Sequence, residues 1–67
     1  MNKLKEKRLA ANLRMVDLAR IADISIATLW NLEQGLDRRA KPETRKKIIT
    51  GLKIAGLSVD EKDVFPE

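Results

Sequence analysis

Histidine, cysteine and tyrosine are absent from this sequence of 67 residues. The lack of cysteine excludes a disulfide scaffold, and the lack of both cysteine and histidine removes the commonest zinc and iron ligand sets. Because only scattered serine and threonine remain, no nucleophile–base pair can be assembled with any specificity. We therefore expect no enzymatic activity, no cofactor, no metal site and no small-molecule ligand.

Long apolar runs are also missing. No segment approaches the about 20 apolar residues that a membrane span requires. The opening stretch, MNKLKEKRLAANL, has no apolar core of the kind found in signal peptides. These absences predict a cytoplasmic protein. The length suits one domain with a small core, so we expect a single domain over residues 1–67.

The positive charge is concentrated in the first part of the chain. Residues 1–57 hold 13 Lys and Arg against 6 Asp and Glu, a net charge of +7, and residues 58–67 hold 1 against 4, a net charge of −3. A basic body of this size favours a polyanionic partner, either nucleic acid or an anionic membrane surface. The alternative is that the lysine-rich helix faces are only solvated.

Apolar residues recur at helical spacing along most of the chain, and no segment alternates as a strand does. Ser25 is a good N-cap for a third helix, which Gly35 ends. Pro42 suits the first position of a fourth helix, and SVDE at 58–61 has the pattern of a capping box for a last one. The chain is thus expected to be all-α. The predicted helices span residues 4–12, 15–22, 25–34, 42–55 and 58–65.

The third predicted helix has two unlike faces. On a helical wheel that starts at Ser25, Leu29 and Leu32 fall on one side, with Ile26 at the edge. The other side carries Ala27, Trp30, Asn31 and Gln34. Trp30 is the only tryptophan of the chain, and a small domain normally uses such a residue in its core. Its outward position indicates a surface for a partner.

Four residues around the break between the second and third helices have an informative spacing. They are Met15, Ala19, Asp23 and Leu29. Their positions resemble the signature of the Cro and lambda-repressor-like helix-turn-helix family, which usually has Gln, Ala, Gly and Val or Ile there. The segment LEQG at 32–35 and Pro42 also match. This resemblance covers residues 3–65 and implies a compact five-helix domain with a helix-turn-helix over about 15–34.

The chain departs from the family pattern at the turn and at the start of the second helix. Asp23 replaces the usual glycine at a position that is expected to need a positive φ, which Asp tolerates better than most residues. Met15 replaces a Gln that reaches a phosphate. Arg14 stands where a Ser or Thr cap is common, and it is a poor cap. An Arg beside a helix N-terminus can bind a phosphate, so we expect Arg14 to take over that contact.

Arg8 falls on the inward face of its helix, together with Leu4 and Ala11, which is an unusual place for a charge. The resemblance implies that it pairs with Glu33, near the end of the third helix. A planar guanidinium can hold a carboxylate through two hydrogen bonds, which suits a partly buried pair. We expect this ion pair to be structural. The alternative is that Arg8 is exposed.

The resemblance also implies that the third helix enters the major groove of double-stranded DNA. Asn31 can read an adenine through paired hydrogen bonds, and apolar side chains such as Ile26 can contact a thymine methyl group. Trp30 is expected on the sugar-phosphate wall or on a thymine methyl group. The alternative is that Ile26 and Trp30 form a protein interface. The expected base-reading residues are Ile26, Ala27, Thr28, Trp30 and Asn31.

The loop RRAK at 38–41 is expected to lie along the phosphates, as an anchor without sequence preference. Its alternative is a solvated charged loop. The expected contacts to the DNA backbone are Arg14, Ser25, Arg38, Arg39 and Lys41.

One such domain touches only a few base pairs, so a homodimer on two half-sites is expected. The C-terminal segment is more apolar than a tail in solvent requires, and its acidic charge argues against a place on DNA. The alternative is that Val64 and Phe65 complete the core, and both roles can hold at once. The candidate dimer surface consists of Leu57, Val59, Val64 and Phe65.

These patterns predict a sequence-specific, double-stranded DNA-binding transcriptional regulator of the phage or mobile-element repressor type, cytoplasmic and associated with the nucleoid. The alternative is a protein-interaction module on the same fold, such as an anti-repressor or an antitoxin, which would use the face of Ile26 and Trp30.

Overall fold

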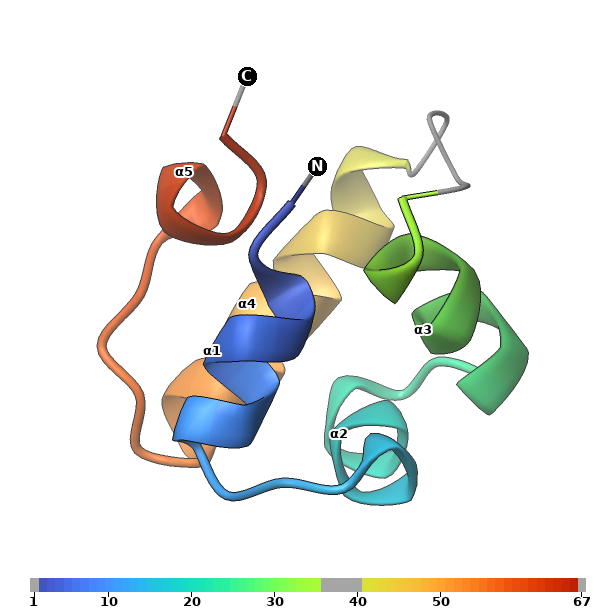
Figure 1. The fold of residues 1–67 in the computed structure, drawn as a ribbon, viewed down its shortest axis with the longest axis horizontal. Coiled ribbons are helices and arrows are strands. Elements are labelled where there is room, and N and C mark those ends of the chain that lie inside the picture. Colours follow the sequence, from blue (N-terminus) through green and yellow to red (C-terminus); the bar gives the residue numbers. More distant parts are fainter. Residues whose placement is uncertain (1, 36–40, 67) are drawn as a thin grey trace.

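Five helices and no strand make up the part of the chain that the computed structural model describes, residues 2–35 and 41–66. The predicted all-α class is confirmed for these residues. In Figure 1, α4 runs behind α1, with α2 and α3 on one side of the pair and α5 on the other. The helices are α1 (Leu4–Ala10), α2 (Met15–Ala22), α3 (Ile26–Glu33), α4 (Pro42–Ile54) and α5 (Glu61–Val64).

Helix ends follow local sequence signals at α3 and α4. The Ser25 hydroxyl accepts a hydrogen bond from the Thr28 amide at 3.0 Å and so caps α3. Gly35 follows the helix with a φ of 71°, a conformation in which glycine has no Cβ to clash. Pro42 opens α4, where its missing N–H costs nothing. These three predicted boundaries are confirmed.

The predicted start of the last helix is wrong. α5 is capped by Asp60 and Asp63, each carboxylate accepting the backbone N–H of the other at 3.1 Å and 2.9 Å, instead of by Ser58 and Glu61. Val59 is buried in the core from the irregular segment before the helix. Because Val59 is buried and the capping box closes at Asp60, the helix begins later in the sequence than predicted. It spans 61–64 instead of 58–65.

A tight turn joins α2 to α3. Asp23 has a φ of 58° and a ψ of 48°, the left-handed conformation that was expected at this position. The Asp23 and Ile24 amides donate to carbonyl oxygens of the last turn of α2, those of Arg20 at 3.2 Å and Ala19 at 3.0 Å. The turn therefore satisfies carbonyls that the helix end leaves unpaired.

Replacing Asp23 with glycine is expected to raise the free energy of unfolding by about 0.5–1 kcal/mol. Glycine removes the Cβ strain of the left-handed conformation, and its own entropy cost offsets only part of that gain. The exposed carboxylate lies 4.0 Å from the Lys47 ammonium, and such surface pairs contribute little. Asp23→Ala is the control, because it removes the same charge and keeps the strain. A urea midpoint for Asp23→Gly at or below that of Asp23→Ala would contradict this account.

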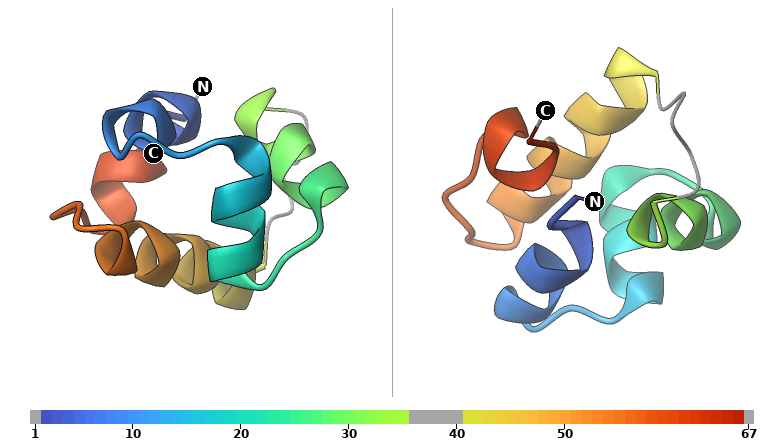
Figure 2. Two further views of the ribbon diagram at one scale, coloured as in Figure 1. Left: turned by 90° about the horizontal axis from the view of Figure 1, so that it is seen from below. Right: turned by 45° about the horizontal axis from the view of Figure 1, so that its top comes forward.

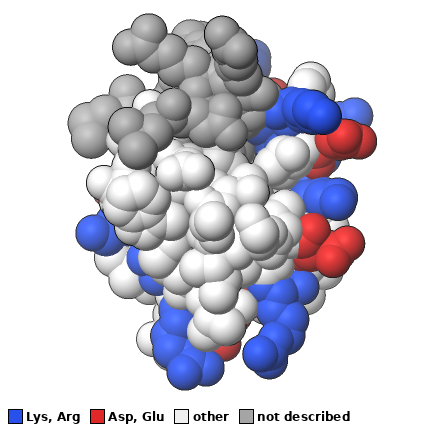
Figure 3. Space-filling model, turned by 90° about the vertical axis from the view of Figure 1, so that its right-hand side faces the viewer, with Lys and Arg blue, Asp and Glu red and all other residues white. Residues whose placement is uncertain are grey.

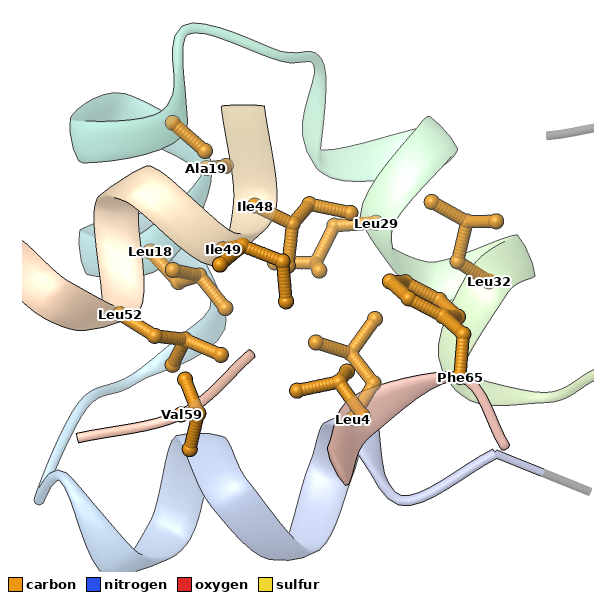
Figure 4. Packing of buried hydrophobic residues seen from close by; sticks show 12 residues of the cluster. Leu4, Leu18, Ala19, Leu29, Leu32, Ile48, Ile49, Leu52, Val59 and Phe65 are labelled. Atoms are coloured by element: carbon orange, nitrogen blue, oxygen red, sulfur yellow. The ribbon is translucent and has the colours of Figure 1, made fainter. Parts of the chain in front are cut away.

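The core lies where the helices converge, as Figure 4 shows. α2 and α4 approach closely at Gly51, because a Cβ there would lie only 3.3 Å from the Cβ of Ala22 and from Cδ1 of Leu18. Glycine at this position thus lets the two helices pack against each other. The most completely buried large side chains are Leu4, Leu18, Leu29, Leu32, Ile48, Leu52 and Val64.

The C-terminal residues help to complete this core, which is the second use expected for Val64 and Phe65. Val59, Val64 and Phe65 are buried within the chain, and Leu57 is partly buried against the core cluster. The Lys3 amide donates to the Val64 carbonyl at 2.8 Å. These contacts hold α5 against the body, on the side of the molecule away from α3 in Figures 1 and 2. Among the described residues, no helix is long and apolar enough to cross a membrane.

Candidate functional site

The outer face of α3, which we define as Ile26, Ala27, Trp30 and Asn31, is the most distinctive surface of the described residues. Leu29 and Leu32 are buried in the core, so the opposite side of the helix must face outward. Ile26 is 50% exposed and Trp30 is 48% exposed, and Ala27 and Asn31 are exposed as well. The outward orientation predicted for Trp30 is confirmed.

The centre of this surface is uncharged. By sequence, Glu33 is the only charged residue within α3, and its carboxylate is turned inward to Arg8. Figure 3 views the molecule from the side that carries α3. Its centre is free of Lys, Arg, Asp and Glu. Lys and Arg lie along its lower and lateral margins, and Asp and Glu lie among them on the right. The geometry is an apolar and amide-bearing helix face with charged residues of both signs at its margins.

Ser25 and Thr28 are joined at the start of α3. Their hydroxyl oxygens lie 2.8 Å apart, in addition to the capping bond from the Thr28 amide to the Ser25 hydroxyl. The Ser25 hydroxyl is therefore committed to the helix end, although its residue remains exposed. Thr28 is half-buried at the border of the outer face.

The ion pair expected between Arg8 and Glu33 is present. Nε of Arg8 lies 2.7 Å from Oε2 of Glu33, and Nη2 lies 3.2 Å from Oε1. Nη1 donates to the Leu13 carbonyl at 2.9 Å. Both side chains are nearly inaccessible to solvent, at 9% and 3% exposure. The guanidinium thus ties α1, the segment after it and the last turn of α3 together.

Arg14 is engaged by a residue that the sequence interpretation did not single out. Asp17 accepts from Nε of Arg14 at 2.9 Å and from Nη2 at 3.0 Å, and it also accepts from the Arg14 amide at 2.9 Å. The hydrogen bonds from the guanidinium and from the amide lower the pKa of Asp17 from 3.8 to about 2. The signal was available, because an acidic residue three positions after an N-cap is the spacing of a capping box.

The acid limb of the stability curve is expected to report this pair. Because the folded state lowers the pKa of Asp17, its contribution is present above about pH 4 and is lost as the pH falls to about 2. Asp17→Asn should therefore lose less stability over this interval than the wild type does, measured by urea unfolding at a series of pH values. Arg14→Met breaks the same pair from the other side and should flatten the curve in the same direction. If stability falls with pH as steeply in both variants as in the wild type, this ion pair is not the source of the pH dependence.

The remaining residues expected to contact the DNA backbone are Lys41, Arg38 and Arg39. Lys41 is exposed and immediately precedes α4. Arg38 and Arg39 lie outside the described residues. Lys47 of α4 reaches the turn before α3 through its contact with Asp23. Within residues 2–35 and 41–66, no three acidic side chains are grouped so that they could hold a metal ion.

Comparisons of this chain with known protein families, with curated proteins and with solved structures gave no match. The functional argument therefore depends on the geometry of α3 and on the chemistry of its neighbours.

Proposed function

We propose that this chain is a sequence-specific, double-stranded DNA-binding transcriptional regulator of the repressor type. In this proposal the domain has the Cro and lambda-repressor-like fold, α2 and α3 form a helix-turn-helix, and the outer face of α3 enters the major groove. The observation that carries the proposal is that face: an exposed helix surface with an amide, a half-exposed tryptophan and no charge, in a strongly basic body.

The distribution of charge matches the groove. Base edges carry hydrogen-bonding atoms and methyl groups without net charge, whereas the phosphates border the groove on both sides. An uncharged helix face, with Lys and Arg among the charged residues at its margins, meets both requirements. The net charge of +7 over residues 1–57 supplies the attraction that depends on salt.

The outer face offers two kinds of contact with bases. The Asn31 amide can donate to N7 and accept from N6 at the edge of one adenine. In this proposal α3 points the amide toward that edge. Ile26, Ala27 and Trp30 can surround thymine methyl groups, and the broad face of Trp30 also suits the deoxyribose wall. Direct readout is thus mostly apolar, with one amide for hydrogen-bonded discrimination.

Arg14 can serve a phosphate without leaving Asp17. A guanidinium has five N–H donors, and the two bonds to Asp17 use one on Nε and one on Nη2. The Nη1 group is not used by these bonds, and the side chain is largely exposed. Asp17 therefore holds the guanidinium in one orientation, and the proposed phosphate contact is made by its outer edge.

The experiment that tests the proposal is a fluorescence titration with duplex DNA of random sequence at two salt concentrations. Trp30 is the only tryptophan, so the emission reports on α3 alone. A change in emission, with an affinity that falls steeply as salt rises, supports DNA binding through this face. No binding by the folded protein, or binding that is insensitive to salt, overturns the proposal.

A matched pair of variants locates the binding surface. Ala27→Glu places a negative charge on the outer face of α3, and Ala10→Glu makes the same change at an exposed alanine of α1. Both alter the net charge equally, so a general electrostatic effect is shared. The proposal requires Ala27→Glu to weaken DNA binding much more than Ala10→Glu does.

Asn31→Ala is expected to reduce discrimination at one base position by about 1–3 kcal/mol, because the paired hydrogen bonds to adenine are lost. The measurement is the affinity for a selected duplex and for its three single-position variants. Gln34→Ala is the control, since it removes an exposed amide just past the end of the helix. An Asn31→Ala protein with the wild-type base preference would remove Asn31 from the readout.

Binding as a homodimer on two half-sites is part of the proposal, because one recognition helix covers few base pairs. Val59, Val64 and Phe65 are buried in the core of each chain. A footprint with two-fold symmetry and two chains per duplex is the expected result.

The exposed pair of Ile26 and Trp30 also favours a second candidate function, a protein-interaction module. Two large apolar side chains four residues apart on one helix form the kind of patch that protein partners cover. A complex formed through this face that tolerates high salt, together with no binding to DNA, would favour this candidate.

A further inference from the structure

The C-terminal end of α3 is held by side chains from the first eight residues of the chain. Nδ2 of Asn2 donates to the Leu32 carbonyl at 2.7 Å, and the next residue, Glu33, is bound by Arg8. The Leu32 carbonyl also accepts the Gly35 amide at 3.1 Å, so both of its lone pairs are used. Asn2 thus completes the hydrogen bonding of a carbonyl at a helix end, where partners within the helix are lacking.

The Asn2 side chain is itself fixed at both ends of its amide. Its Oδ1 accepts the Leu4 amide at 3.1 Å, which satisfies a donor at the start of α1. The following residue, Lys3, donates its amide to the Val64 carbonyl of the C-terminal segment at 2.8 Å. The residue is partly buried. The Asn2 side-chain amide therefore links the first turn of α1 to the last turn of α3. The backbone of the next residue, Lys3, is hydrogen-bonded to Val64 of α5.

We propose that Asn2 is a positioning residue for the outer face of α3. α3 has only eight residues. Its N-terminal end is set by the turn at Asp23 and by the Ser25 cap, and Asn2 joins Arg8 in holding the opposite end, next in the chain to Asn31. A readout face must be held to within about half an ångström, which a single end cannot ensure for a helix of two turns. The inference depends on the proposed function, because it concerns which bases this face would read.

Two substitutions at Asn2 separate its two hydrogen bonds. Asn2→Asp keeps an oxygen that accepts from Leu4 and replaces the donor to Leu32 with a second acceptor. Asn2→Ala removes both. The control is Val59→Ala, which weakens the core near Leu52, away from Leu32 in Figure 4. The control therefore lowers stability without touching the end of α3.

The first measurement does not involve DNA. In two-dimensional NMR spectra, both Asn2 variants should shift the amide signals of residues 31–35 and the indole signal of Trp30. The Val59→Ala spectrum should leave these signals in place. If the α3 signals of both Asn2 variants coincide with those of the wild type, Asn2 does not position the helix and the inference is overturned.

The second measurement is the ratio of affinity for a selected duplex to affinity for random duplex. We expect the ratio to fall about fivefold to tenfold in both Asn2 variants, the effect of losing roughly one hydrogen bond at the proposed interface, and to stay constant in Val59→Ala. The ratio also cancels the general effect of the added charge in Asn2→Asp. If the wild type prefers a duplex and the Asn2 variants keep the full ratio, the positioning role is overturned. If the wild type binds no DNA while the α3 signals shift, the proposed function fails and the structural role of Asn2 stands.

Discussion

Replacing Arg8 with methionine is expected to lower the free energy of unfolding by about 3–5 kcal/mol, the typical cost of removing one partner of a buried ion pair. The Glu33 carboxylate, which is 3% exposed, would lose both of its bonds to the guanidinium, and the Leu13 carbonyl would lose its donor. A domain of this size is stable by only about 3–10 kcal/mol. The substitution should therefore remove a large part of the stability of the fold, which urea unfolding followed by circular dichroism would measure.

The double variant Arg8→Met with Glu33→Leu distinguishes the electrostatic cost of an unpaired charge from the packing cost of lost side-chain volume. Replacing both charges with apolar groups removes the unpaired carboxylate, so most of the lost stability should return. This result would assign the cost to the isolated charge instead of to packing. A single-variant cost below about 1 kcal/mol, as for exposed pairs, would show that Arg8 is not a structural residue.

Replacing Phe65 with alanine is expected to cost about 3–5 kcal/mol, because a buried aromatic ring is lost and a cavity remains. The ring is 9% exposed, and the Arg45 guanidinium lies 5.4 Å from its centroid, where a cation–π interaction adds about 0.5–1 kcal/mol. Ile54→Ala is the control: its side chain is 68% exposed on α4, so its removal should change the stability by less than about 0.5 kcal/mol.

The dependence on protein concentration distinguishes a core residue from an interface residue. A side chain buried within one chain contributes the same stability at every concentration, whereas an interface contribution grows with concentration. The loss in Phe65→Ala should therefore be equal at low and high micromolar protein. A loss that appears only at high concentration would restore Phe65 to a dimer surface.

The proposed function and the fold share one structural requirement, which is the rigid presentation of α3. Buried leucines set its inner side, and Arg8 and Asn2 hold its last turn. The exposed side is then free to carry residues chosen for a partner instead of for stability. Under the proposed function, this division accounts for a tryptophan outside the core of so small a domain.

The sequence by itself determined the features that depend on neighbouring residues. The Ser25 cap, the stop at Gly35 and the start at Pro42 follow from the backbone preferences and hydrogen-bonding groups of single side chains. The left-handed Asp23 was expected from the resemblance of this turn to the helix-turn-helix family. The periodicity of α3 was enough to turn Trp30 outward, since two buried leucines fix the phase of a helix.

Only the tertiary structure decided which of two uses an apolar residue near the C-terminus would have. The local sequence around Val64 and Phe65 is the same whether these side chains cover the core or a second chain. Which surface they cover depends on where α5 packs. The start of α5 moved to Asp60 for the same reason, because burying Val59 is a long-range contact. The link from Asn2 to Leu32 spans 30 residues, and no local pattern specifies a hydrogen bond whose partners meet only after the helices have packed.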